Sequence, residues 1–330
     1  MMMPKVLASA SRRCITAIAA CLLTCSASFA QEFPTRTVRL IVPYVPGNGA
    51  DIVARIVAEQ LGKIWGHAVT VDNKPGASGI VAMQEAKNSP ADGYHLVLGD
   101  VGTLAINPHL YRTLPYNPTK DFTIVTDLLT TPWGFFVPRS GSIQTLEDLV
   151  KAAKAQPGKL TYGTSGKGAP NSMAIGLLKL RLGINMLEVP YKKTSEVYTG
   201  IAAGRLDLMA GSMATIDAYK DRMTTVALAA DERSQHFREV PTLSEASGIP
   251  DFTVTAWAML VTRSTVPPAI VQKIRADVMR VFELPEVKTR IEQLGMKGGG
   301  KQDVKTLNQF VADEAQRYGA VVSAEKLEMQ

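Results

Sequence analysis

The chain has 330 residues, a formal net charge of +6 and 46% hydrophobic residues, so it is long and apolar enough to bury a sizeable core in about two domains. Its mild positive charge, with no basic cluster interleaved with aromatic residues, argues against nucleic acid as a partner. All three cysteines (Cys14, Cys21 and Cys25) lie near the start, which excludes disulfides, thiol nucleophiles and thiolate metal sites from the remainder.

The first thirty residues have the pattern of a cleavable secretory signal peptide. Three basic residues precede an apolar run without acidic residues, Cys14 to Leu23, and Ser28-Phe29-Ala30 places small residues at positions −3 and −1 of a cleavage site. We therefore expect cleavage before Gln31 and a mature chain, of net charge +3, in the periplasm.

Two other interpretations of this segment are a transmembrane anchor and a lipidated cysteine. A transmembrane anchor needs about 20 apolar residues, and only about ten are present. Lipidation would use Cys25 in Leu22-Leu23-Thr24-Cys25, but Thr24 is an unfavourable residue directly before a lipidated cysteine. The cleavable signal peptide is the interpretation that we adopt.

Beyond residue 31, apolar strand-like runs alternate with helical patterns, which predicts an α/β fold with largely parallel sheets. The run Val38 to Val42 leads through a glycine-rich loop to a helix from Asp51 to about Leu61. Three more strands lead in the same way into loops of Gly, Ser, Thr or Asn: Ala68 to Val71, His95 to Leu98 and Leu160 to Tyr162. Helices are expected to begin near Ile80, to end before Asn107 and to run from Pro170 to Leu182. Ligands of open α/β sheets bind at the carboxyl ends of strands, where these loops lie.

Two apolar runs do not lead through a loop into a helix in this way: Phe122 to Val137 and Val254 to Val261. We interpret both as strands that cross between two lobes, although one continuous sheet is also compatible with the length. Three amphipathic helices close the chain: Ala269 to Phe282, Glu286 to Leu294 and Asp303 to Ser323. The expected division is a signal peptide at 1–30, the first part of lobe 1 at 31–130, lobe 2 at 131–256, and the return to lobe 1 with the C-terminal helices at 257–330.

The first loop, Pro43 to Asp51, is the strongest candidate for a ligand site. A strand, a glycine-rich turn and a helix start place several backbone N–H groups around one concavity, and the positive end of the helix dipole adds to their attraction for an anion. No Lys or Arg lies in the loop. An ordinary turn with Asp51 as the N-terminal cap of the helix is equally compatible with the loop taken alone. The recurrence of the pattern along the chain favours the anion site.

Residue patterns of catalytic and metal sites are absent from the sequence. The four histidines (His67, His95, His109 and His236) form no His-x-x-x-His pair. Gly163-Thr164-Ser165-Gly166-Lys167 departs from a nucleophile elbow at its last position, and no Gly-Lys pair is followed by Ser or Thr, as a phosphate-binding loop requires. We therefore expect no metal and no cofactor, while enzymatic activity is unsupported rather than excluded.

An ordered series of motifs from about Phe33 to the C-terminus resembles the Bug-type extracytoplasmic solute receptors of tripartite tricarboxylate transporters. The series begins with Arg39-Leu40-Ile41-Val42-Pro43, the glycine loop and Asp51. The motifs that follow in the expected order are Asn73 to Gly79, Pro90 to Tyr94, Ala105 to Tyr111, Leu114 to Pro118, Val189 to Lys192, Val240 to Ala246 and the Trp257 segment. One such motif would be weak, whereas the whole series is specific.

The resemblance implies a two-lobed periplasmic binding protein of the Venus-flytrap kind, type II-like, whose mostly parallel sheets are joined by two crossing strands. It also implies that the first two glycine loops bind a carboxylate through backbone amides, and that loops of the third strand and of the second lobe complete the cleft. The ligand-binding residues so implied are Tyr44, Gly47, Asn48, Gly49, Ala50, Asp51, Ala77, Ser78, Gly79, Gly102, Thr103, Ser165, Gly166, Lys167 and Tyr191.

The chain departs from the family pattern at several positions. Tyr44 and Gly47-Asn48-Gly49 stand where the family usually has Phe and three glycines, so Asn48 is expected either to contact the ligand or to support a left-handed turn. Lys167 and Lys193 replace Asn and Gly, and Ala210-Gly211 stand where an acidic residue and a bulky ring are usual. These changes suit a larger or more anionic ligand, unless both lysines lie on solvated surface, as most lysines do.

The resemblance thus implies a binding protein that captures a small organic carboxylate between two lobes and delivers it to the membrane subunits of a tripartite transporter. The ligand stays open between aliphatic di- or tricarboxylates and aromatic acids, because backbone amides recognise only the carboxylate. We expect a monomer without cofactor, metal or nucleic acid. Two alternatives are a periplasmic ligand sensor that docks to a signalling receptor and an enzyme that acts on a small organic acid.

Overall fold

The computed structural model describes residues 33–213, 219–234 and 237–327. The chain divides into two units, Met1–Thr35 and Arg36–Gln330, and all helices and strands of the described residues lie in the second. The signal peptide expected at 1–30 lies outside the described residues.

The first lobe contains the parallel sheet that the strand–loop–helix rhythm predicts. β1 (Val38–Val42) lies between β2 (Val69–Asn73) and β3 (His95–Asp100), with Leu40 opposite both Val71 and Leu96. β1 is a nearly continuous apolar run because α2 and α3 both pack against it. The helical segments of this lobe are α2 (Gly49–Trp65), η1 (Ala77–Gly79), α3 (Ile80–Asn88), η2 (Val101–Ile106), α4 (Asn107–Leu110) and α5 (Pro118–Asp121).

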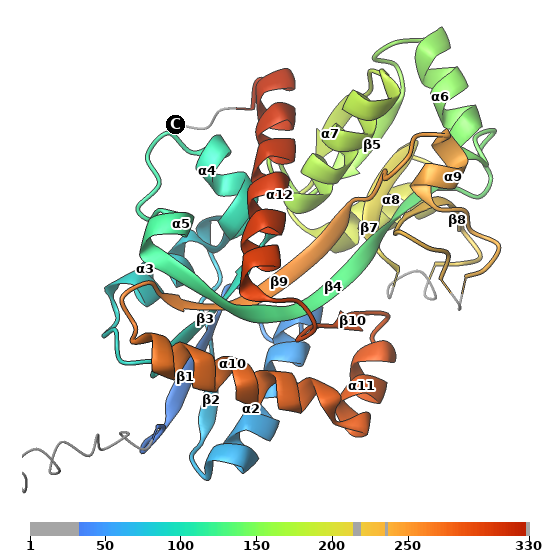
Figure 1. Ribbon diagram of the computed structural model, residues 1–330. Coiled ribbons are helices and arrows are strands. Elements are labelled where there is room, and N and C mark those ends of the chain that lie inside the picture. The colour runs from blue at the N-terminus through green and yellow to red at the C-terminus, as the bar shows by residue number, and fades with distance from the viewer. Residues whose placement is uncertain (1–32, 214–218, 235–236, 328–330) are drawn as a thin grey trace, which may run out of the picture. The chain divides into compact units, whose positions relative to one another are not determined.

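Two long antiparallel strands connect the lobes, as Figure 1 shows in green and orange. β4 (Phe122–Pro138) pairs with β9 (Thr255–Arg263) from Phe122 opposite Arg263 to Pro132 opposite Thr255. From Trp133 onward β4 instead pairs with strands of the second lobe. The partner of β4 therefore changes between Pro132 and Trp133.

The second lobe repeats the parallel arrangement at the far end of the sheet. β5 lies between β6 and β7 in parallel, while β8 runs antiparallel to the end of β4. Its strands are β5 (Thr161–Thr164), β6 (Leu187–Pro190), β7 (Leu208–Ser212) and β8 (Met223–Ala229). Its helices are α6 (Leu146–Ala155), α7 (Pro170–Leu182), α8 (Thr194–Ala202) and α9 (Leu243–Ser247).

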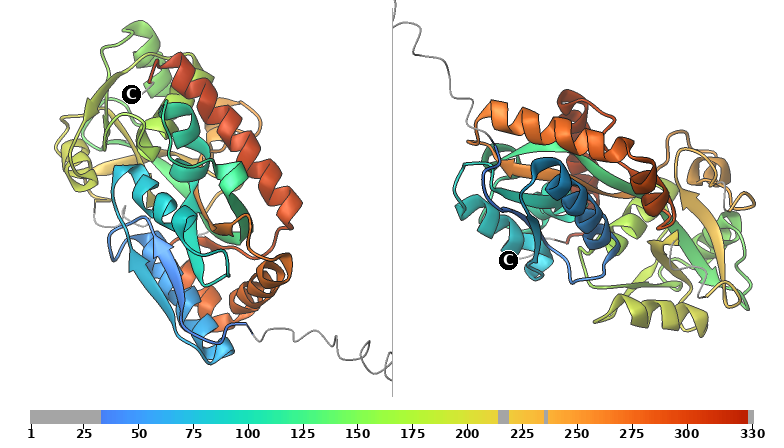
Figure 2. Two further views of the ribbon diagram at one scale, coloured as in Figure 1. Left: turned by 90° about the vertical axis from the view of Figure 1, so that its left-hand side faces the viewer. Right: turned by 90° about the horizontal axis from the view of Figure 1, so that it is seen from below.

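The C-terminal segment returns to the first lobe. α10 (Pro268–Glu283) packs against α2 and β4, and Figure 2 shows α10 beside α2. α11 (Pro285–Glu292) and β10 (Lys297–Gly298) follow, and β10 pairs with β4. α12 (Val304–Ala324) contacts η2 and α4 of the first lobe and α7 of the second, so one helix touches both lobes.

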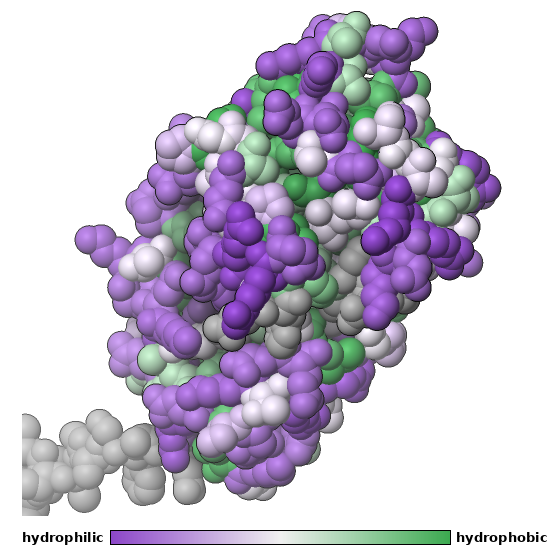
Figure 3. All heavy atoms as spheres, turned by 90° about the vertical axis from the view of Figure 1, so that its right-hand side faces the viewer, coloured by the Kyte–Doolittle hydropathy of each residue, from purple (hydrophilic) through white to green (hydrophobic). Residues whose placement is uncertain are grey.

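Local sequence signals explain where several helices begin and end. Thr145 and Asp303 cap α6 and α12 with side-chain oxygens that accept backbone N–H groups of the first turn. Gly66 and Gly183 end α2 and α7 in the left-handed conformation that glycine adopts without a steric penalty. Hydrophilic residues dominate the face in Figure 3. The apolar residues Leu149 of α6, Val57 of α2 and Val321 of α12 are fully buried, as expected for amphipathic helices that pack on a core.

The structure confirms the two-lobed α/β fold with two crossing strands and modifies its details. The sheet is mixed rather than mostly parallel, because the crossing strands pair antiparallel in the order β2-β1-β3-β9-β4-β7-β5-β6. Strand pairing runs unbroken through β4, as in the alternative of one continuous sheet. The first predicted helix begins two residues earlier, at Gly49. The division at 31–130, 131–256 and 257–330 stays a prediction.

We expect Gly299→Ala to destabilise the fold, because an added Cβ would collide with the backbone of Asp127 where the chain after β10 docks on β4. Backbone atoms on a paired strand have little room to move, so a loss of about 1–3 kcal/mol in the free energy of unfolding is expected. Urea unfolding followed by circular dichroism measures it. Gly62→Ala is the control: it lies in α2 with only ordinary contacts and should be neutral or stabilising by about 0.5–1 kcal/mol. Equal stability of the two variants would contradict the close approach.

Candidate functional site

A cavity of about 620 Å³ takes residues from both lobes, the crossing strands and the C-terminal segment. Its first-lobe residues are Tyr44, Asn48, Gly49, Ala50, Ile52 and Val101, and its crossing-strand residues are Leu129, Thr131, Trp133, Ala256, Trp257 and Ala258. Its second-lobe residues are Ser165, Pro170, Asn171, Thr194, Tyr198, Gly211 and Ser212, and the C-terminal segment adds Leu294 and Met296. None of these lining residues is ionisable except the two tyrosines, so the wall consists of apolar surface and neutral hydrogen-bonding groups.

The start of α2 forms part of the cavity wall. Asn48 has extended backbone angles and caps the helix: its side-chain oxygen accepts the N–H of Ala50 at 2.9 Å. The left-handed residue of the loop is Gly47, with φ 85°. Asn48 therefore supports the helix start rather than a left-handed turn, and the alternative with Asp51 as the cap is wrong. Gly47 directly precedes the lining residue Asn48 in sequence, but Gly47 itself does not line the cavity.

Asp51 lies behind the loop, with 1% of its surface exposed, and fastens it. Its carboxylate accepts the N–H of Gly47 at 2.8 Å and the Nε–H of Arg55 at 3.0 Å on one oxygen, and Nδ2 of Asn73 at 2.7 Å on the other. Burial by itself raises the pKa of Asp51, but hydrogen bonds from Arg55, Asn73 and Gly47 outweigh it and lower that pKa below its usual value. The structure thus gives Asp51 the role of positioning the loop.

Asn73 connects the first loop to the second. Its Nδ2 donates to the carbonyl of Tyr44 at 2.9 Å as well as to Asp51, while its Oδ1 accepts from Arg55 at 2.8 Å. Because Asn73 is the last residue of β2, the loop after β2 is tied by these bonds to the loop after β1.

The second loop has an unusual backbone. Ala77, Ser78 and Gly79 all have positive φ, at 45°, 52° and 83°. Two non-glycine residues in this region cost about 1–3 kcal/mol each, and such strain persists where surrounding contacts impose it. Asn107 donates to the carbonyl of Ser78 at 3.0 Å and Tyr111 donates to its hydroxyl at 3.2 Å. None of the three is among the lining residues of the cavity, so their contact with ligand stays a prediction.

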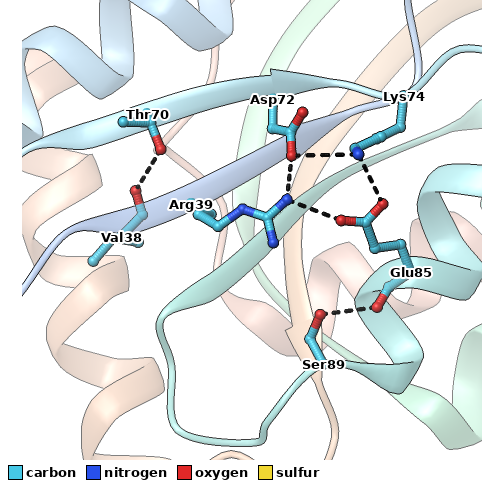
Figure 4. Close-up of polar contacts among 7 residues, drawn as sticks. All are labelled: Val38, Arg39, Thr70, Asp72, Lys74, Glu85 and Ser89. Carbon is cyan, nitrogen blue, oxygen red and sulfur yellow. Dashed lines mark hydrogen bonds and ion pairs between the residues drawn. The ribbon is translucent and has the colours of Figure 1, made fainter.

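A cluster of four charged side chains fixes the segment before the second loop (Figure 4). The guanidinium of Arg39 on β1 donates to Asp72 and, at 2.9 Å, to Glu85 on α3. Lys74 lies 3.4 Å from Glu85 and 3.7 Å from Asp72. All four side chains are about one-third exposed, so each pair contributes little to stability, but together they orient β2 and α3 at the loop.

The third loop is tied to the first by Tyr44. Its hydroxyl donates to Asp100, which also forms a reciprocal capping box with Thr103 at the start of η2. Burial raises the pKa of Tyr44 well above its usual value, and the negative charge of Asp100 and the hydrogen bond to it add to this. The phenol therefore stays protonated and donating. Thr103 is fully buried in the box and Gly102 stands beside it, so only Val101 of this segment lines the cavity.

The second-lobe loop presents Ser165 and the start of α7 to the cavity. Oδ1 of Asn171 accepts the hydroxyl of Ser165 at 3.0 Å and the N–H of Ser172 at 3.0 Å, which fixes the loop against the helix. Gly166 is left-handed, with φ 118°, and does not line the cavity. Lys167 is exposed and also lies off the wall, where the surface alternative placed it.

Tyr191 belongs to a different, more open pocket of about 320 Å³ with Arg205 and Tyr219. Lys193 is exposed at the start of α8. Of the fifteen predicted site residues, the cavity wall therefore contains five, which are Tyr44, Asn48, Gly49, Ala50 and Ser165. The remaining ten surround these five as supports or lie on other surfaces.

Aromatic residues that the loop motifs do not identify form much of the wall. Trp257 on β9 donates its indole N–H to the buried carboxylate of Glu314 at 3.0 Å, and Phe310 packs edge-on against its ring. Trp133 stands where β4 changes partners. The available sequence signal is a tryptophan within each crossing strand, and the Trp257 segment is one of the motifs of the resemblance.

Gly211 determines the position of Tyr198 in the second-lobe wall. An added Cβ at Gly211 would collide with the hydroxyl of Tyr198, so only glycine lets the phenol reach this place. Tyr198 of α8 therefore fills the space beside Gly211 in the wall.

Within the described ranges, no group of three or more His, Cys, Asp or Glu side chains could hold a metal ion. In the same ranges, no helix has both the length and the apolar character needed to cross a membrane.

The chain is similar to known proteins over nearly its whole length. The model of the tripartite tricarboxylate transporter family receptor matches residues 53–327. A UPF0065 protein from the tcbD-tcbE intergenic region of Pseudomonas sp. (strain P51) is 30% identical, over 96% of this chain and 95% of its own. The structure of R. palustris Rpa4515 with adipate is similar at 28% identity and a TM-score of 0.76, covering 88% of this chain and 97% of that one. MatC from Rhodopseudomonas palustris with bound malate is similar at 29% identity and a TM-score of 0.75, covering 88% and 100%.

We expect Asp51→Asn to lower the free energy of unfolding by about 1–3 kcal/mol at pH 7, because it removes the charge that Arg55 and Asn73 bind. The folded-state pKa of Asp51 is lowered, so this stabilisation is complete above the unfolded pKa of about 3.9 and is lost as pH falls through the folded value. The gap between variant and wild type should therefore close in acid. Glu59→Gln is the matched control, since Glu59 forms the same i,i+4 pair with Lys63 on α2 but is 48% exposed, and its effect should be smaller. A gap that does not depend on pH would contradict the role of the charge.

Proposed function

The chain belongs to the tripartite tricarboxylate transporter receptor family, and we propose that it binds a small organic carboxylate in this cavity and delivers it to the membrane subunits of a tripartite transporter. The observation that carries the proposal is the start of α2 in the cavity wall. Asn48, Gly49 and Ala50 place the positive end of a 17-residue helix at a cavity whose lining residues include no acidic side chain to repel an anion.

Two solved relatives support a carboxylate as the ligand, since one contains adipate and the other malate. The network behind the loop supports it as well. The charge of Asp51 is balanced by Arg55, its other oxygen accepts a hydrogen bond from Asn73, and it is buried and absent from the cavity wall, so it does not oppose an anion at the helix start. Backbone and amide groups then face the ligand while the charged groups hold the backbone in place.

We propose that the second loop, which belongs to the same lobe as the start of α2, contacts the same ligand, and that closure about the crossing strands brings Ser165 of the second lobe to it. Asn73, which precedes the second loop, donates hydrogen bonds to Tyr44 and Asp51 of the first loop. Ala77 to Gly79 therefore follow shortly after a residue that is bonded to the first loop. The strain at Ala77 and Ser78 is of the kind that accumulates at ligand clamps. The protein is proposed to act as a monomer in the periplasm, with no turnover of the bound acid.

A thermal-shift screen over mono-, di- and tricarboxylates and aromatic acids tests the function. A ligand present at 100 times its dissociation constant adds about 2.7 kcal/mol to stability, which raises the melting temperature measurably. A carboxylate that raises it, and that is recovered unchanged after incubation, supports a binding protein. Consumption of the acid would instead favour an enzyme, and no shift with any carboxylate would reject the proposal.

We expect Gly49→Val to abolish carboxylate binding. A side chain at Gly49 would collide with the methyl end of Met296 and stand in front of the first turn of α2, where the anion is proposed to bind. Titration calorimetry with the best acid of the screen measures the loss. Gly62→Val, the same change in the same helix away from the cavity, should bind as wild type. The double variant Gly49→Val/Met296→Ala separates the causes: recovery of affinity would show that only the collision mattered and would contradict an anion at the helix start.

We expect the exported protein to begin at Gln31. Small residues at Ser28 and Ala30 fit the specificity of signal peptidase, so the mature chain should lose the whole apolar run before them. Mass spectrometry of protein from the periplasmic fraction measures the mature N-terminus. An intact Met1, or a lipid-modified Cys25 in the membrane fraction, would contradict this expectation.

A further inference from the structure

Two sequence motifs of the first lobe, Ala105 to Tyr111 and Leu114 to Pro118, have no part in the proposed function so far. Each supplies one buried polar side chain: Asn107 is 1% exposed and Tyr116 is 3% exposed. Neither residue lines the ligand cavity. Because buried polar groups in native proteins are hydrogen-bonded, the partners of these two side chains indicate what the motifs do.

The hydroxyl of Tyr116 is bonded to the third loop. It donates to the carbonyl of Thr103 at 2.7 Å, and the direction of this bond is fixed because a carbonyl can only accept. Thr103 forms the capping box with Asp100, to which Tyr44 of the cavity wall donates. Burial raises the pKa of Tyr116, a hydrogen bond from Asn107 lowers it, and the charge of Asp100 raises it further. The phenol therefore stays protonated and donating.

Asn107 carries the connection from Tyr116 to the second loop. Its Nδ2 donates to the phenol oxygen of Tyr116 at 3.3 Å and to the carbonyl of Ser78 at 3.0 Å. That carbonyl and the N–H of Gly79 belong to one planar peptide group, and the N–H closes the loop by donating to Gly76 at 2.9 Å. Asn107 thus orients the peptide group that follows a residue with a strained φ of 52°.

The position of the Tyr116 hydroxyl is determined from outside the ligand loops. The ring of Tyr116 lies edge-on to Phe122, the first residue of β4, with the ring centroids 6.0 Å apart. Asn117, the next residue in the chain, caps α5 by accepting two backbone N–H groups of that helix, and Pro118 is the first helical residue. A capped helix and the start of a crossing strand therefore hold the ring.

The bonds through Tyr116 complete a set of three connections among the ligand loops. Asn73 joins the first loop to the strand that leads into the second. Tyr44 joins the first loop to the third through Asp100. Tyr116 joins the third loop to the second through Asn107. Each pair of loops thus has its own polar connection.

We propose that Tyr116 is a positioning residue of the ligand site, which holds the second and third loops in one fixed arrangement without touching the ligand. The proposal rests on the proposed function, because it takes these loops to surround the bound carboxylate. Through Asn107 the phenol fixes the peptide group between Ser78 and Gly79. Through Thr103 it fixes the segment whose capping box accepts the hydroxyl of a cavity-wall residue.

Amide hydrogen exchange of the free protein tests the connection, because it needs no ligand. Tyr116→Phe keeps the ring and removes only the hydroxyl, so the amide of Gly79 should exchange about 2- to 13-fold faster, as expected for the loss of one hydrogen bond. Tyr162→Phe is the matched control: it is the same change at a tyrosine of the second lobe that is also 3% exposed, and it should leave the Gly79 amide unchanged. Faster exchange at Thr103 with an unchanged Gly79 would limit Tyr116 to a local structural role and overturn the proposal.

A second variant tests the route through Asn107. Asn107→Asp sets a carboxylate oxygen against the carbonyl of Ser78, so the amide of Gly79 should again exchange faster than in the wild type. Adding Tyr116→Phe to this variant should change the exchange of Gly79 little further, because both changes break one chain of bonds. Independent, additive effects of the two substitutions would contradict the route.

Titration calorimetry with malate and with adipate tests whether the connection matters for binding. Tyr116→Phe should weaken each acid that the wild type binds by about 2- to 13-fold, while Tyr162→Phe should not. Faster exchange at Gly79 with unchanged affinity would overturn the positioning role and leave the proposed function standing. No binding of either acid by the wild type would count against the proposed function and not against the connection, which the exchange of Gly79 decides.

Discussion

The antiparallel pairing of β4 with β9 is the constraint on which the rest of the structure depends. Because β4 pairs with β9 as far as Pro132 and with β7 and β8 from Trp133, one strand belongs to both lobes. The cavity lies at this change of partner: Thr131 is the last lining residue before it and Trp133 the first after it. Motion of one lobe relative to the other must bend the chain here, so the residues that line the cavity are also those that such a motion displaces.

The buried carboxylate of Glu314 on α12 positions the second crossing strand, β9. Glu314, 3% exposed, accepts the indole N–H of Trp257 and is neutralised by Arg317 at 2.5 Å. Arg317 also donates to the carbonyl of Thr253, just before β9. A buried carboxylate without its cation would be strongly destabilising, so removal of Arg317 alone should destabilise the fold more than loss of a surface ion pair. The part of the cavity wall formed by β9 is thus held by hydrogen bonds to α12, a helix that contacts both lobes.

The charged residues around the first loop also lie outside the cavity wall. Asp51, Arg55 and Asn73 bond one another behind the loop, and Asp100 accepts from Tyr44 beside it. Their charges determine where the backbone lies but do not line the cavity. A site built in this way attracts an anion through helix starts and neutral donors, and its discrimination among acids depends on the neutral side chains further along the wall.

Much of the fold could be predicted because its signals are local. The apolar run Val38 to Val42 and the helix Pro170 to Leu182 have the predicted ends, since burial on both faces and a proline start are visible in the sequence. The sequence predicts the start of the first helix at Asp51, and a short polar side chain near a helix start resembles a cap. Only the folded contacts show that Asn48 caps the helix and that Asp51 turns inward to Gly47.

The sequence by itself determined the lobes, the crossing strands and the glycine loops, because each is written in a contiguous stretch of residues with its own periodicity or turn chemistry. The tertiary structure decided which side chains face the cavity. Thr131 and Trp133 of β4, Asn171 of α7 and Met296 come from three separate segments with no shared motif, and they meet only because β4 changes partners and the C-terminal segment returns to the first lobe. Lys167, which stands inside a loop motif, points to solvent for the same reason: the direction of a side chain depends on the packing of distant segments, which no local pattern records.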